Sequence, residues 1–420
     1  MEISELLKGV NCSCGKTHCC AIKYVFIENN ATKHLKDICA DYNRILIVAD
    51  ENTYGVAGAK TEEYISEKIA DRQIFGKEIL IPNEDAIDAV KAKLNNIDLI
   101  IGIGSGVIQD LCKYVSHFEH VPYFVVATAP SMDGYASSGA AMITGGMKVT
   151  YSAKVPDAFI ADTSILKDAP IEMIKAGYGD IIGKFSALND WKLGQIVNGE
   201  YFCQYIYDLT YDMLKKTLPL AESLLARDEE SIKVLTEALI VVGIAMSFAE
   251  NSRPASGSEH HLSHFFEITG IVNGKEYLPH GIDVAFSTIE TAKIRQKLAN
   301  VPFPKKPFVM DRTDYEAKMK EVYSTVAEGC IALQDKLGTY KSDRHSVYLE
   351  KENEIKAILR EAPTSEEITE ILSRVGLDRK QFTDTYTNKQ IKDAISFAKD
   401  LKDRYSVLWM YFDMFGTEEI

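Results

Sequence analysis

Three of the nine histidines of this 420-residue chain lie close together in the stretch SEHHLSH. A long apolar segment, EALIVVGIAMSFA, precedes the stretch and predicts a buried helix; two phenylalanines follow it, so a second helix is expected to begin near Ser258. Because an α-helix repeats every 3.6 residues, His260 and His264 fall on one face, one turn apart, whereas His261 points elsewhere. Two imidazoles on one helix face commonly hold a divalent metal, or one metal and one group of a substrate.

The alternative for the same stretch is a surface cluster of histidines without a role. Arg253, the serines and the histidines lie directly after the apolar segment, and polar groups in such a position are costly to bury unless they have partners. We therefore expect a site here.

A glycine turn in the first half forms a second candidate site. The run IDLIIGI, Ile97–Ile103, predicts a buried strand, and a helix is expected over Val107–Ser116. Glycines between a strand and a helix let the backbone approach an anion, to which the helix N-terminus offers N–H groups and a positive dipole end. The spacing G-x-G-x-G over Gly102–Gly106 differs from the G-x-G-x-x-G dinucleotide fingerprint, and glycine turns also simply close strand–helix joints, so this loop alone is weak evidence.

Carboxylates near strand ends could bind the other groups of such a ligand. Asp50 ends an earlier aliphatic run and suits a ribose diol; the alternative is a helix N-cap. Asp133 lies in the loop TAPSMDGYASSGAA, Thr128–Ala141, whose small and polar residues suit a ligand better than an ordinary turn.

Two further residues stand outside these stretches. Asp180 either faces a cleft or forms an ion pair with Lys184, which is one helical turn away. His280 lies at the mouth of an expected helix after a polar turn, where a lone histidine is more often a cap or a surface residue.

The elements that must position these residues change in character along the chain. Strands alternate with helices up to about residue 161, which predicts a parallel sheet with helices on both faces. Helical runs dominate from Ser164, and one helix is expected over Pro170–Trp191. We expect an α/β Rossmann-like N-terminal domain, residues 1–163, and an all-α helical C-terminal domain, residues 164–420. The expected strands are Lys23–Glu28, Arg44–Ala49, Glu78–Ile81, Ile97–Ile103, Pro122–Ala127, Lys148–Tyr151 and Ala158–Ala161, with a helix over Asn52–Ala70.

Composition excludes several classes of protein. A chain with 46% hydrophobic and 26% charged residues is globular rather than disordered. Its net charge of -14, without a dense Lys/Arg stripe, argues against nucleic acid as a partner. We find no apolar run of the ~18 residues that a membrane helix needs, which argues against membrane insertion. The acidic N-terminus is unlike a secretory signal, so a cytoplasmic protein is expected.

Four of the eight cysteines lie in the run CSCGKTHCC near the N-terminus, with His18 among them. A structural metal is one interpretation. The spacing is not the paired C-x-x-C of a strong zinc signal, and no second pair follows nearby, so a reduced N-terminal turn is the favoured interpretation in a cytosolic setting.

Together these stretches resemble the sn-glycerol-1-phosphate dehydrogenases, and specifically their bacterial AraM-like branch. That group is related to glycerol dehydrogenases, iron-containing alcohol dehydrogenases and dehydroquinate synthases. The resemblance covers about residues 20–295, and the remainder is placed only as a helical extension. It is carried by GSGVIQD (104–110), TAPSMDGYASSGAA (128–141), GDIIGKFSALNDW (179–191), SRPASGSEHHLSH (252–264) and HG (280–281).

The resemblance implies a role for each matching position. The metal ligands would be Asp180, His260 and His280, with Asp180 also near the substrate. Asp133 and His264 would be the catalytic residues that contact the substrate. Relatives often carry three consecutive glycines where this chain has Gly102–Gly106, and Ile103 is expected to complete the strand instead. The implied nucleotide-binding positions are Asp50, Gly106, Val107, Ile108, Gln109, Asp110, Thr128, Ala129, Pro130, Ser131 and Ser137.

One carboxylate and two imidazoles leave coordination positions open, as in a catalytic metal site. The implied reaction is the reversible reduction of dihydroxyacetone phosphate to sn-glycerol 1-phosphate by NADH or NADPH, in a cleft between the two domains. Zn²⁺, Ni²⁺ and Fe²⁺ all suit this ligand set, and the resemblance favours zinc or nickel. Asp50 would repel a 2′-phosphate and so favours NAD, although the family includes members that accept both coenzymes.

Two other functions stay open from the sequence. One is a dehydrogenase of another polyol or polyol phosphate in the same superfamily, and the other is a relative that binds nucleotide or metal without catalysis. A homodimer is expected from the resemblance alone.

Overall fold

The computed structural model describes residues 2–78, 80–145 and 147–417. By its contacts the chain divides into two compact units, and each is described by itself. The first unit comprises Met1–Ile181 and Lys215–Ser252, and the second comprises Ile182–Leu214 and Arg253–Ile420. The boundary between two domains that the sequence predicts after residue 163 stays a prediction.

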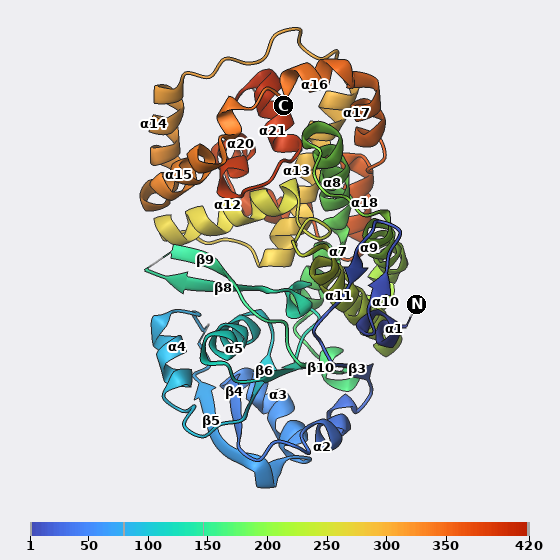
Figure 1. Cartoon of the computed structure of the whole chain (residues 1–420), viewed down its shortest axis with the longest axis vertical. Helices are drawn as coiled ribbons and strands as arrows, with labels where there is room; N and C mark the ends of the chain where they lie inside the picture. The colour runs from blue at the N-terminus through green and yellow to red at the C-terminus, as the bar shows by residue number, and fades with distance from the viewer. Residues whose placement is uncertain (1, 79, 146, 418–420) are drawn as a thin grey trace. The chain divides into compact units, whose positions relative to one another are not determined.

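The first unit contains a six-stranded parallel sheet (Figure 1), as the alternation of strands and helices predicts. Strands β4 and β6 lie side by side; from β4 the chain proceeds to β5 at one edge, and from β6 it proceeds in the other direction to β7 and β10. Ligands of such sheets bind outside the carboxyl ends of the strands at this switch point. The strand order is β3 (Tyr24–Glu28), β10 (Ala158–Asp162), β7 (Tyr123–Ala127), β6 (Leu99–Gly104), β4 (Ile45–Asp50), β5 (Ile69–Phe75).

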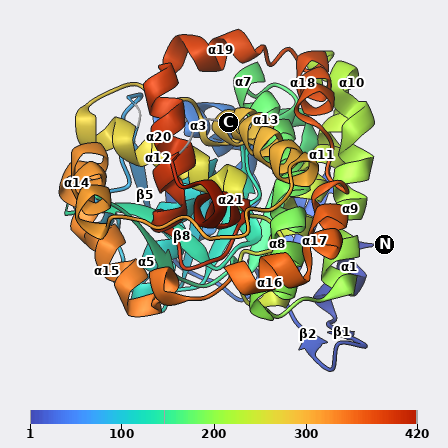
Figure 2. The ribbon, with the colours of Figure 1, turned by 90° about the horizontal axis from the view of Figure 1, so that it is seen from above.

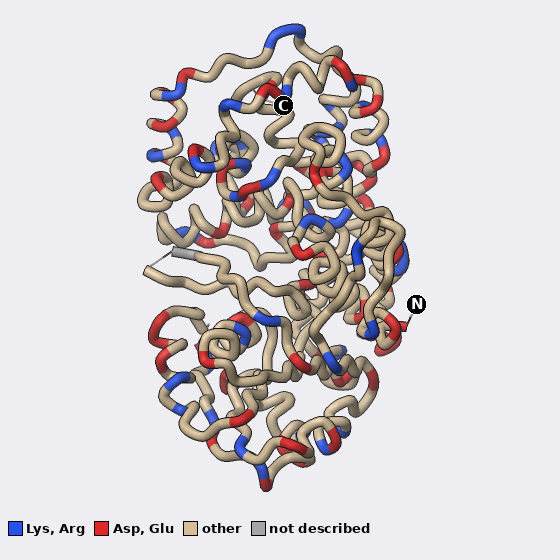
Figure 3. Tube along the Cα trace, viewed as in Figure 1, with Lys and Arg blue, Asp and Glu red and all other residues tan. Residues whose placement is uncertain are grey.

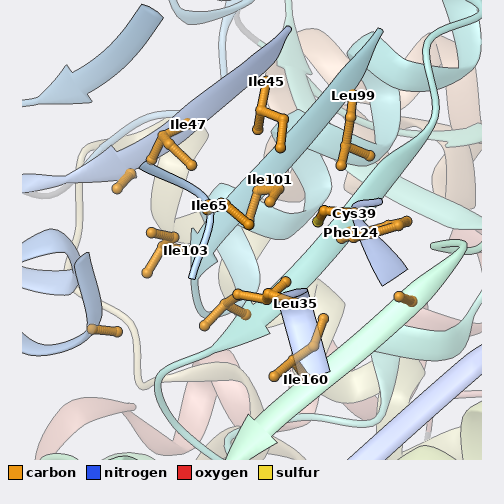
Figure 4. Close-up of a cluster of buried hydrophobic side chains, with 14 of the residues drawn as sticks. Leu35, Cys39, Ile45, Ile47, Ile65, Leu99, Ile101, Ile103, Phe124 and Ile160 are labelled. Atoms are coloured by element: carbon orange, nitrogen blue, oxygen red, sulfur yellow. The ribbon is translucent and has the colours of Figure 1, made fainter. Parts of the chain in front are cut away.

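Opposite faces of this sheet pack against different helices. One face forms a closed apolar cluster that includes Ile47, Ile101 and Phe124 together with Leu35 of α2 (Leu35–Ile38) (Figure 4). The other face is covered by α5 (Gly106–Glu119), whose Cys112 lies against Gly102 of β6. Alternate residues of each strand therefore enter two separate cores, which is why the strands are apolar without interruption.

The edge strand β5 corrects the expected strand at Glu78–Ile81 and the expected helix up to Ala70. The helix, α3 (Glu51–Glu62), ends earlier, and Glu78, Leu80 and Ile81 are in neither helix nor strand. Residue 79 lies outside the described residues. Because β5 is at the edge of the sheet, Asp71 and Arg72 in its centre stay exposed, and together with Gln73 they hide the strand pattern.

The predicted strand over Lys148–Tyr151 is confirmed, but it is not part of the parallel sheet. This segment is within a strand, β9 (Met147–Ser152), but β9 pairs antiparallel with β8 (Gly139–Thr144) in a separate two-stranded sheet. The remaining helices of the first unit are α1 (Ile3–Leu7), α4 (Glu84–Lys91), α6 (Thr163–Leu166), α7 (Ile171–Ile182), α10 (Ala221–Leu225) and α11 (Glu229–Ala249), with the short 3-10 helix η3 (Gly134–Ala136).

The predicted buried helix before the histidine stretch is α11. By length and composition alone α11 is able to cross a membrane, but 78% of its most apolar 18-residue window is buried inside the protein. It packs on η3, where Gly243 lies so close to Ala136 that a Cβ there would be 2.5 Å from the alanine Cβ. These contacts are those of a core helix.

The described part of the second unit is helical, which confirms the expected helical extension. Its centre is α12 (Ser258–Asn273) packed on α13 (His280–Asn300), with α21 (Val407–Phe415) also against α13 (Figure 2). The expected helix over Pro170–Trp191 is two helices, because α7 ends at Ile182 and α8 (Lys184–Asn198) begins after Gly183. The other helices are α9 (Gln204–Thr217), α14 (Arg312–Tyr323), α15 (Ala327–Leu337), α16 (His345–Glu350), α17 (Glu352–Leu359), α18 (Ser365–Arg374), α19 (Arg379–Thr385) and α20 (Asn388–Phe397), with the 3-10 helix η7 (Ala398–Leu401).

Candidate active site

Three histidine rings gather within the second unit. His260 and His264 lie one turn apart on α12, with ring centroids 6.2 Å from each other. His280, the first residue of α13, brings its ring centroid to 5.2 Å from that of His260 and 5.5 Å from that of His264. The predicted helix face is confirmed, and so is the start of α12 at Ser258. The sequence left open whether His280 is a helix cap or part of a site. Its ring belongs to the histidine cluster.

Hydrogen bonds orient the rings of this cluster. His260 Nδ1 is 2.6 Å from Oε1 of the buried Glu259, whose carboxylate also accepts a bond from the Gly257 amide. A carboxylate on Nδ1 keeps the proton there and leaves Nε2 as the atom that can bind a metal. His280 Nδ1 is 3.5 Å from Ser263 Oγ, a longer contact. The sequence pattern did not single out Glu259, although its position directly before His260 was a usable signal.

His261 points away from the three clustered rings, as its place on the helix predicts. It is fully buried, and neither of its nitrogens has a hydrogen-bond partner. Burial and the nearby charges of Lys402, Arg404 and Arg253 hold the pKa of His261 well below its usual range. It is therefore neutral at physiological pH and borders a positively charged group.

That positively charged group is built around Ser256 at the start of α12, and we call Arg253, Lys402 and Arg404 the basic group. Lys402 Nζ donates to Ser256 Oγ and Arg404 Nη1 donates to the Ser256 carbonyl, each at 3.2 Å. Arg253 donates to the Tyr405 carbonyl and to the carboxylate of Glu200. Burial lowers the pKa of Arg404 to about 10, so it stays a cation at neutral pH. The carboxylates of Asp403, Glu200 and Glu259 also act on the pKa of Arg404, so the group is mixed in charge. Its cations could still bind an anion by charge-assisted hydrogen bonds.

Asp180 is in the first unit, near the end of α7, and is completely buried. Its Oδ2 accepts a hydrogen bond of 2.9 Å from the backbone amide of Asp133. Gly177 makes this possible, because a Cβ at that position would lie 1.9 Å from the Pro130 carbonyl oxygen. The glycine lets α7 lie directly against the loop Thr128–Ala141, so the structure joins two sequence-predicted residues, Asp133 and Asp180.

The glycine turn lies at the switch point of the sheet, as the nucleotide hypothesis requires. Ile103 is buried and completes β6, as expected. Gly104 is needed for packing, because a Cβ there would lie 2.7 Å from Ile108 Cβ of α5. Gly106 begins α5, and the side chain of Ser105 does not cap the helix, so the first amides of α5 have no side-chain cap. Such a helix start is suited to bind a phosphate.

The other predicted nucleotide residues hold the same region together. The side-chain amide of Gln109 donates through Nε2 to the backbone carbonyls of Gly102 and Gly104, each at 3.1 Å, and so stabilises the turn. Ser137 Oγ donates to the Gly134 carbonyl and Ser131 Oγ is 3.5 Å from Tyr135 Oη. Val107 and Ile108 follow Gly106 in the first turn of α5, and Asp110 lies on the same helix. Thr128, Ala129 and Pro130 continue directly from β7.

Asp50 takes the alternative that the sequence left open. It is the N-cap of α3, where Oδ1 accepts a bond of 2.8 Å from the Thr53 amide in a capping box. Asp50 also ends β4, on the other side of the switch point from Gly104. A ribose contact through its second oxygen stays a prediction.

Lys113 is a residue that the sequence pattern did not indicate. Its fully buried ammonium donates to the carbonyls of Gly134 and Gly139 at 2.8 and 2.9 Å and lies 3.6 Å from Asp110. Burial lowers the pKa of Lys113. It ties the loop that carries Asp133 to α5; the long separation along the chain gives no sequence signal for this contact.

Charge is spread evenly over each unit. Lys and Arg are interspersed with Asp and Glu along the described chain (Figure 3).

Comparisons with known proteins agree with this geometry. The iron-containing alcohol dehydrogenase family matches residues 26–170. The chain is 33% identical to glycerol-1-phosphate dehydrogenase (NAD(P)+) of Halalkalibacterium halodurans over 66% of this chain and 72% of that protein. It is 26% identical to the Bacillus licheniformis protein of the same name, over 94% of this chain and 90% of that one. A Thermococcus sibiricus protein of that name is 33% identical over 64% of this chain and 77% of its own.

Solved structures show the same fold at low identity. A probable glycerol dehydrogenase from Sinorhizobium meliloti superposes with a TM-score of 0.62 at 16% identity, with 92% of each chain covered. An iron-containing alcohol dehydrogenase from Thermococcus thioreducens gives 0.59 at 15% identity, with 90% of each chain covered.

These matches define an NAD(P)-dependent, metal-containing dehydrogenase with the expected fold. The chain belongs to the glycerol-1-phosphate dehydrogenase (NAD(P)+) family.

Proposed function

We propose that this protein catalyses the reversible, NAD(P)H-linked reduction of dihydroxyacetone phosphate to sn-glycerol 1-phosphate. The observation that carries the proposal is the cluster of the His260, His264 and His280 rings, which suits a metal and a group of the substrate. The three homologues described above are named for this activity.

We assign the catalytic metal to Asp180, His260 and His280. One carboxylate and two imidazoles are a ligand set that leaves coordination positions for a substrate. The orientation of His260 by Glu259 supports the assignment, since it leaves Nε2 available. A divalent cation in this group would polarise the ketone and stabilise the alkoxide that forms from it. Zinc and nickel are the metals that we propose, with iron(II) less favoured.

The chain's own residues orient the substrate and the proton. His264, next to both candidate histidine ligands, is positioned to contact the substrate hydroxyl or to relay its proton. Asp133, held beside Asp180 through its own amide, is the second candidate for that role. The substrate phosphate would meet the basic group, whose Lys402 and Arg404 come from the segment after residue 296.

The nucleotide would bind at the switch point of the sheet. The first turn of α5, from Gly106, would accept the pyrophosphate, and Asp50 would contact the ribose. The carboxylate of Asp50 favours NAD over NADP, because it would repel a 2′-phosphate. We further propose a cytoplasmic homodimer, on the basis of the family resemblance.

The test is NADH and NADPH oxidation by chelated protein reloaded separately with Zn²⁺, Ni²⁺ or Fe²⁺. The substrates are dihydroxyacetone phosphate and dihydroxyacetone, and the chirality of the product is determined. We expect metal-dependent reduction of the phosphate ester alone, to the sn-1 isomer. Turnover of dihydroxyacetone alone would assign the protein to the polyol dehydrogenases, and coenzyme binding without turnover would make it a non-catalytic relative.

Variants separate the proposed roles. His260→Ala should lose both metal and activity and keep the fold, whereas His264→Ala should keep the metal and lose kcat/KM. Lys402→Met should raise KM for dihydroxyacetone phosphate by about tenfold or more, since charge-assisted hydrogen bonds contribute about 1.5–3 kcal/mol each. Lys306→Met, at an exposed position, is the matched control and should change nothing. An unchanged KM in Lys402→Met would remove the basic group from the substrate site.

A further inference from the structure

The place of His280 in the histidine cluster depends on where α13 begins. Residues 273–277, which lead to α13, are exposed, and Leu278 is the first buried residue after them. The N-cap of α13 is Pro279, which makes no side-chain hydrogen bond to the helix, and His280 is the first helical residue. Its Nδ1 is 3.5 Å from Ser263 Oγ of α12, a long contact. The contacts of the residues on either side of His280 are therefore important for the position of its ring.

One buried phenol, that of Tyr386, bonds to the chain both before and after His280. The Leu278 amide donates to Tyr386 Oη at 2.9 Å, and that hydroxyl donates to the carboxylate of Asp283, at 2.9 Å from each oxygen. Both Tyr386 and Asp283 are buried. Burial and the neighbouring Asp283 raise the pKa of Tyr386, so the hydroxyl keeps its proton and remains a donor. The hydroxyl therefore joins the end of the exposed loop to the first turn of α13.

The ring of Tyr386 makes the connection to α12. Tyr386 lies between α19 and α20, and α20 packs on α12 (Figure 2). Its ring stacks on Phe266 of α12, two residues after His264, with ring centroids 4.1 Å apart and an interplanar angle of 16°. Phe382 of α19 packs against Phe266 and against Phe286 of α13, with ring centroids 5.4 and 5.6 Å apart. The phenol is thus held to α12 through its ring and to the start of α13 through its hydroxyl.

We propose that Tyr386 is a positioning residue that sets the place of the His280 ring relative to His260 and His264. The two rings on α12 are placed by one helix, whereas the third comes from α13, so its distance from them depends on how the two helix starts are joined. Tyr386 acts through Leu278 and Asp283 rather than on the substrate. The consequence for metal binding rests on the proposed function, since a metal site needs its ligands held within about 0.5 Å.

The alternative is that Tyr386 only stabilises the fold, and the chain offers a matched control for it. Tyr323 is also completely buried, and its ring packs on Phe265 of α12 with ring centroids 5.4 Å apart. Its hydroxyl donates to the Phe397 carbonyl at 2.8 Å, in the C-terminal segment rather than at the start of α13. Tyr323→Phe therefore removes a buried hydroxyl beside the same helix and leaves the contacts around His280 in place.

The first measurement follows the rings themselves in the chelated full-length protein. Histidine carrying ¹³C, in a deuterated background, allows the nuclear Overhauser effect between ring protons of His264 and His280 to be measured, with His264→Gln and His280→Gln to assign the signals. The two ring centroids are 5.5 Å apart, and the effect falls steeply with distance. We expect Tyr386→Phe to reduce this cross-peak by half or more and Tyr323→Phe to leave it unchanged. A cross-peak that is equal in Tyr386→Phe and Tyr323→Phe would overturn the proposal.

The second measurement is zinc affinity by competition with a chelator. Tyr386→Phe should bind zinc about tenfold more weakly than the parent, as for the loss of other groups that orient metal ligands, and Tyr323→Phe should match the parent. The double variant Tyr386→Phe/Asp283→Leu protects the test against a single variant that does not fold. With both polar partners replaced by apolar groups, its thermal stability should recover, while its zinc affinity should stay low because the Leu278 amide still lacks its acceptor. Recovery of both together would show a merely structural role and overturn the proposal.

The two measurements let this inference and the proposed function fail separately. A reduced cross-peak in Tyr386→Phe with unchanged zinc affinity would support the positioning role and contradict the assignment of His280 as a metal ligand. An unchanged cross-peak would remove Tyr386 from the site whatever the protein does with zinc or with dihydroxyacetone phosphate.

Discussion

Among single residues, Glu259 has the most specific testable role. Burial raises the pKa of its carboxyl, while the bond from the Gly257 amide opposes that rise, and Oε1 faces His260 Nδ1. Glu259→Gln keeps the shape but weakens the acceptor, so we expect the affinity for the catalytic metal to fall about 10–100-fold. Competition with a chelator would measure the change, with Glu276→Gln at an exposed position as the control. Equal affinities in Glu259→Gln and the parent protein would show that Glu259 does not tune the ligand.

Whether the role of a single residue could be predicted from the sequence depends on how far along the chain its partners lie. The shared face of His260 and His264 follows from helix periodicity, and the structure confirms it. The role of His280 came only from the family resemblance, because nothing local distinguishes a ligand from a helix cap. Lys402 could not be predicted, since it meets Ser256 from a segment 146 residues away.

Of the elements, the joint between β6 and α5 depends on glycine. Gly104→Ala would place a Cβ 2.7 Å from Ile108 Cβ and 2.8 Å from Ile108 Cγ1, so α5 must shift. We expect a loss of about 1–3 kcal/mol in the free energy of unfolding, as for other overpacked cores, and a higher KM for the coenzyme. Chemical denaturation and steady-state kinetics would measure both.

Gly55→Ala is the matched control, because nothing lies within 4 Å of a Cβ at this exposed position in the middle of α3. Alanine there should stabilise the protein by up to about 1 kcal/mol through helix propensity. If Gly104→Ala behaved like this control, the close packing of α5 would not position the nucleotide loop.

Strands were predictable in proportion to their burial. The central strands β4, β6 and β7 are buried on both faces, so their aliphatic runs are visible in the sequence. The edge strand β5 is half exposed and carries Asp71, Arg72 and Gln73, and for that reason its position was predicted wrongly. The pairing of β9 with β8 could not be predicted either, because a local sequence pattern does not show which strands are neighbours.

On the scale of the whole chain, the segment after residue 296 belongs to the core of the second unit rather than to an appendage. The last helix, α21, is almost entirely apolar and buried. Asp190 connects it to the histidine cluster, because Oδ1 accepts a bond of 2.8 Å from the Val407 amide and Oδ2 accepts one of 2.6 Å from the Ser258 amide. One carboxylate therefore anchors the first turns of both α21 and α12. The sequence could show helices here but not this connection, which joins residues 217 positions apart.

Removal of that carboxylate should destabilise the unit and disturb its histidine cluster together. Asp190→Ala leaves two buried amides without acceptors, each costing about 1–3 kcal/mol, so we expect a loss of about 2–5 kcal/mol in the free energy of unfolding. Thermal and chemical unfolding would measure it, with Asp384→Ala at an exposed position of α19 as the control. Because α12 begins at the lost contact, the remaining folded protein should also bind the catalytic metal more weakly. A variant as stable as the control, with unchanged metal affinity, would show that α12 is positioned without the C-terminal helix, and the final segment would then need another reason to be buried against it.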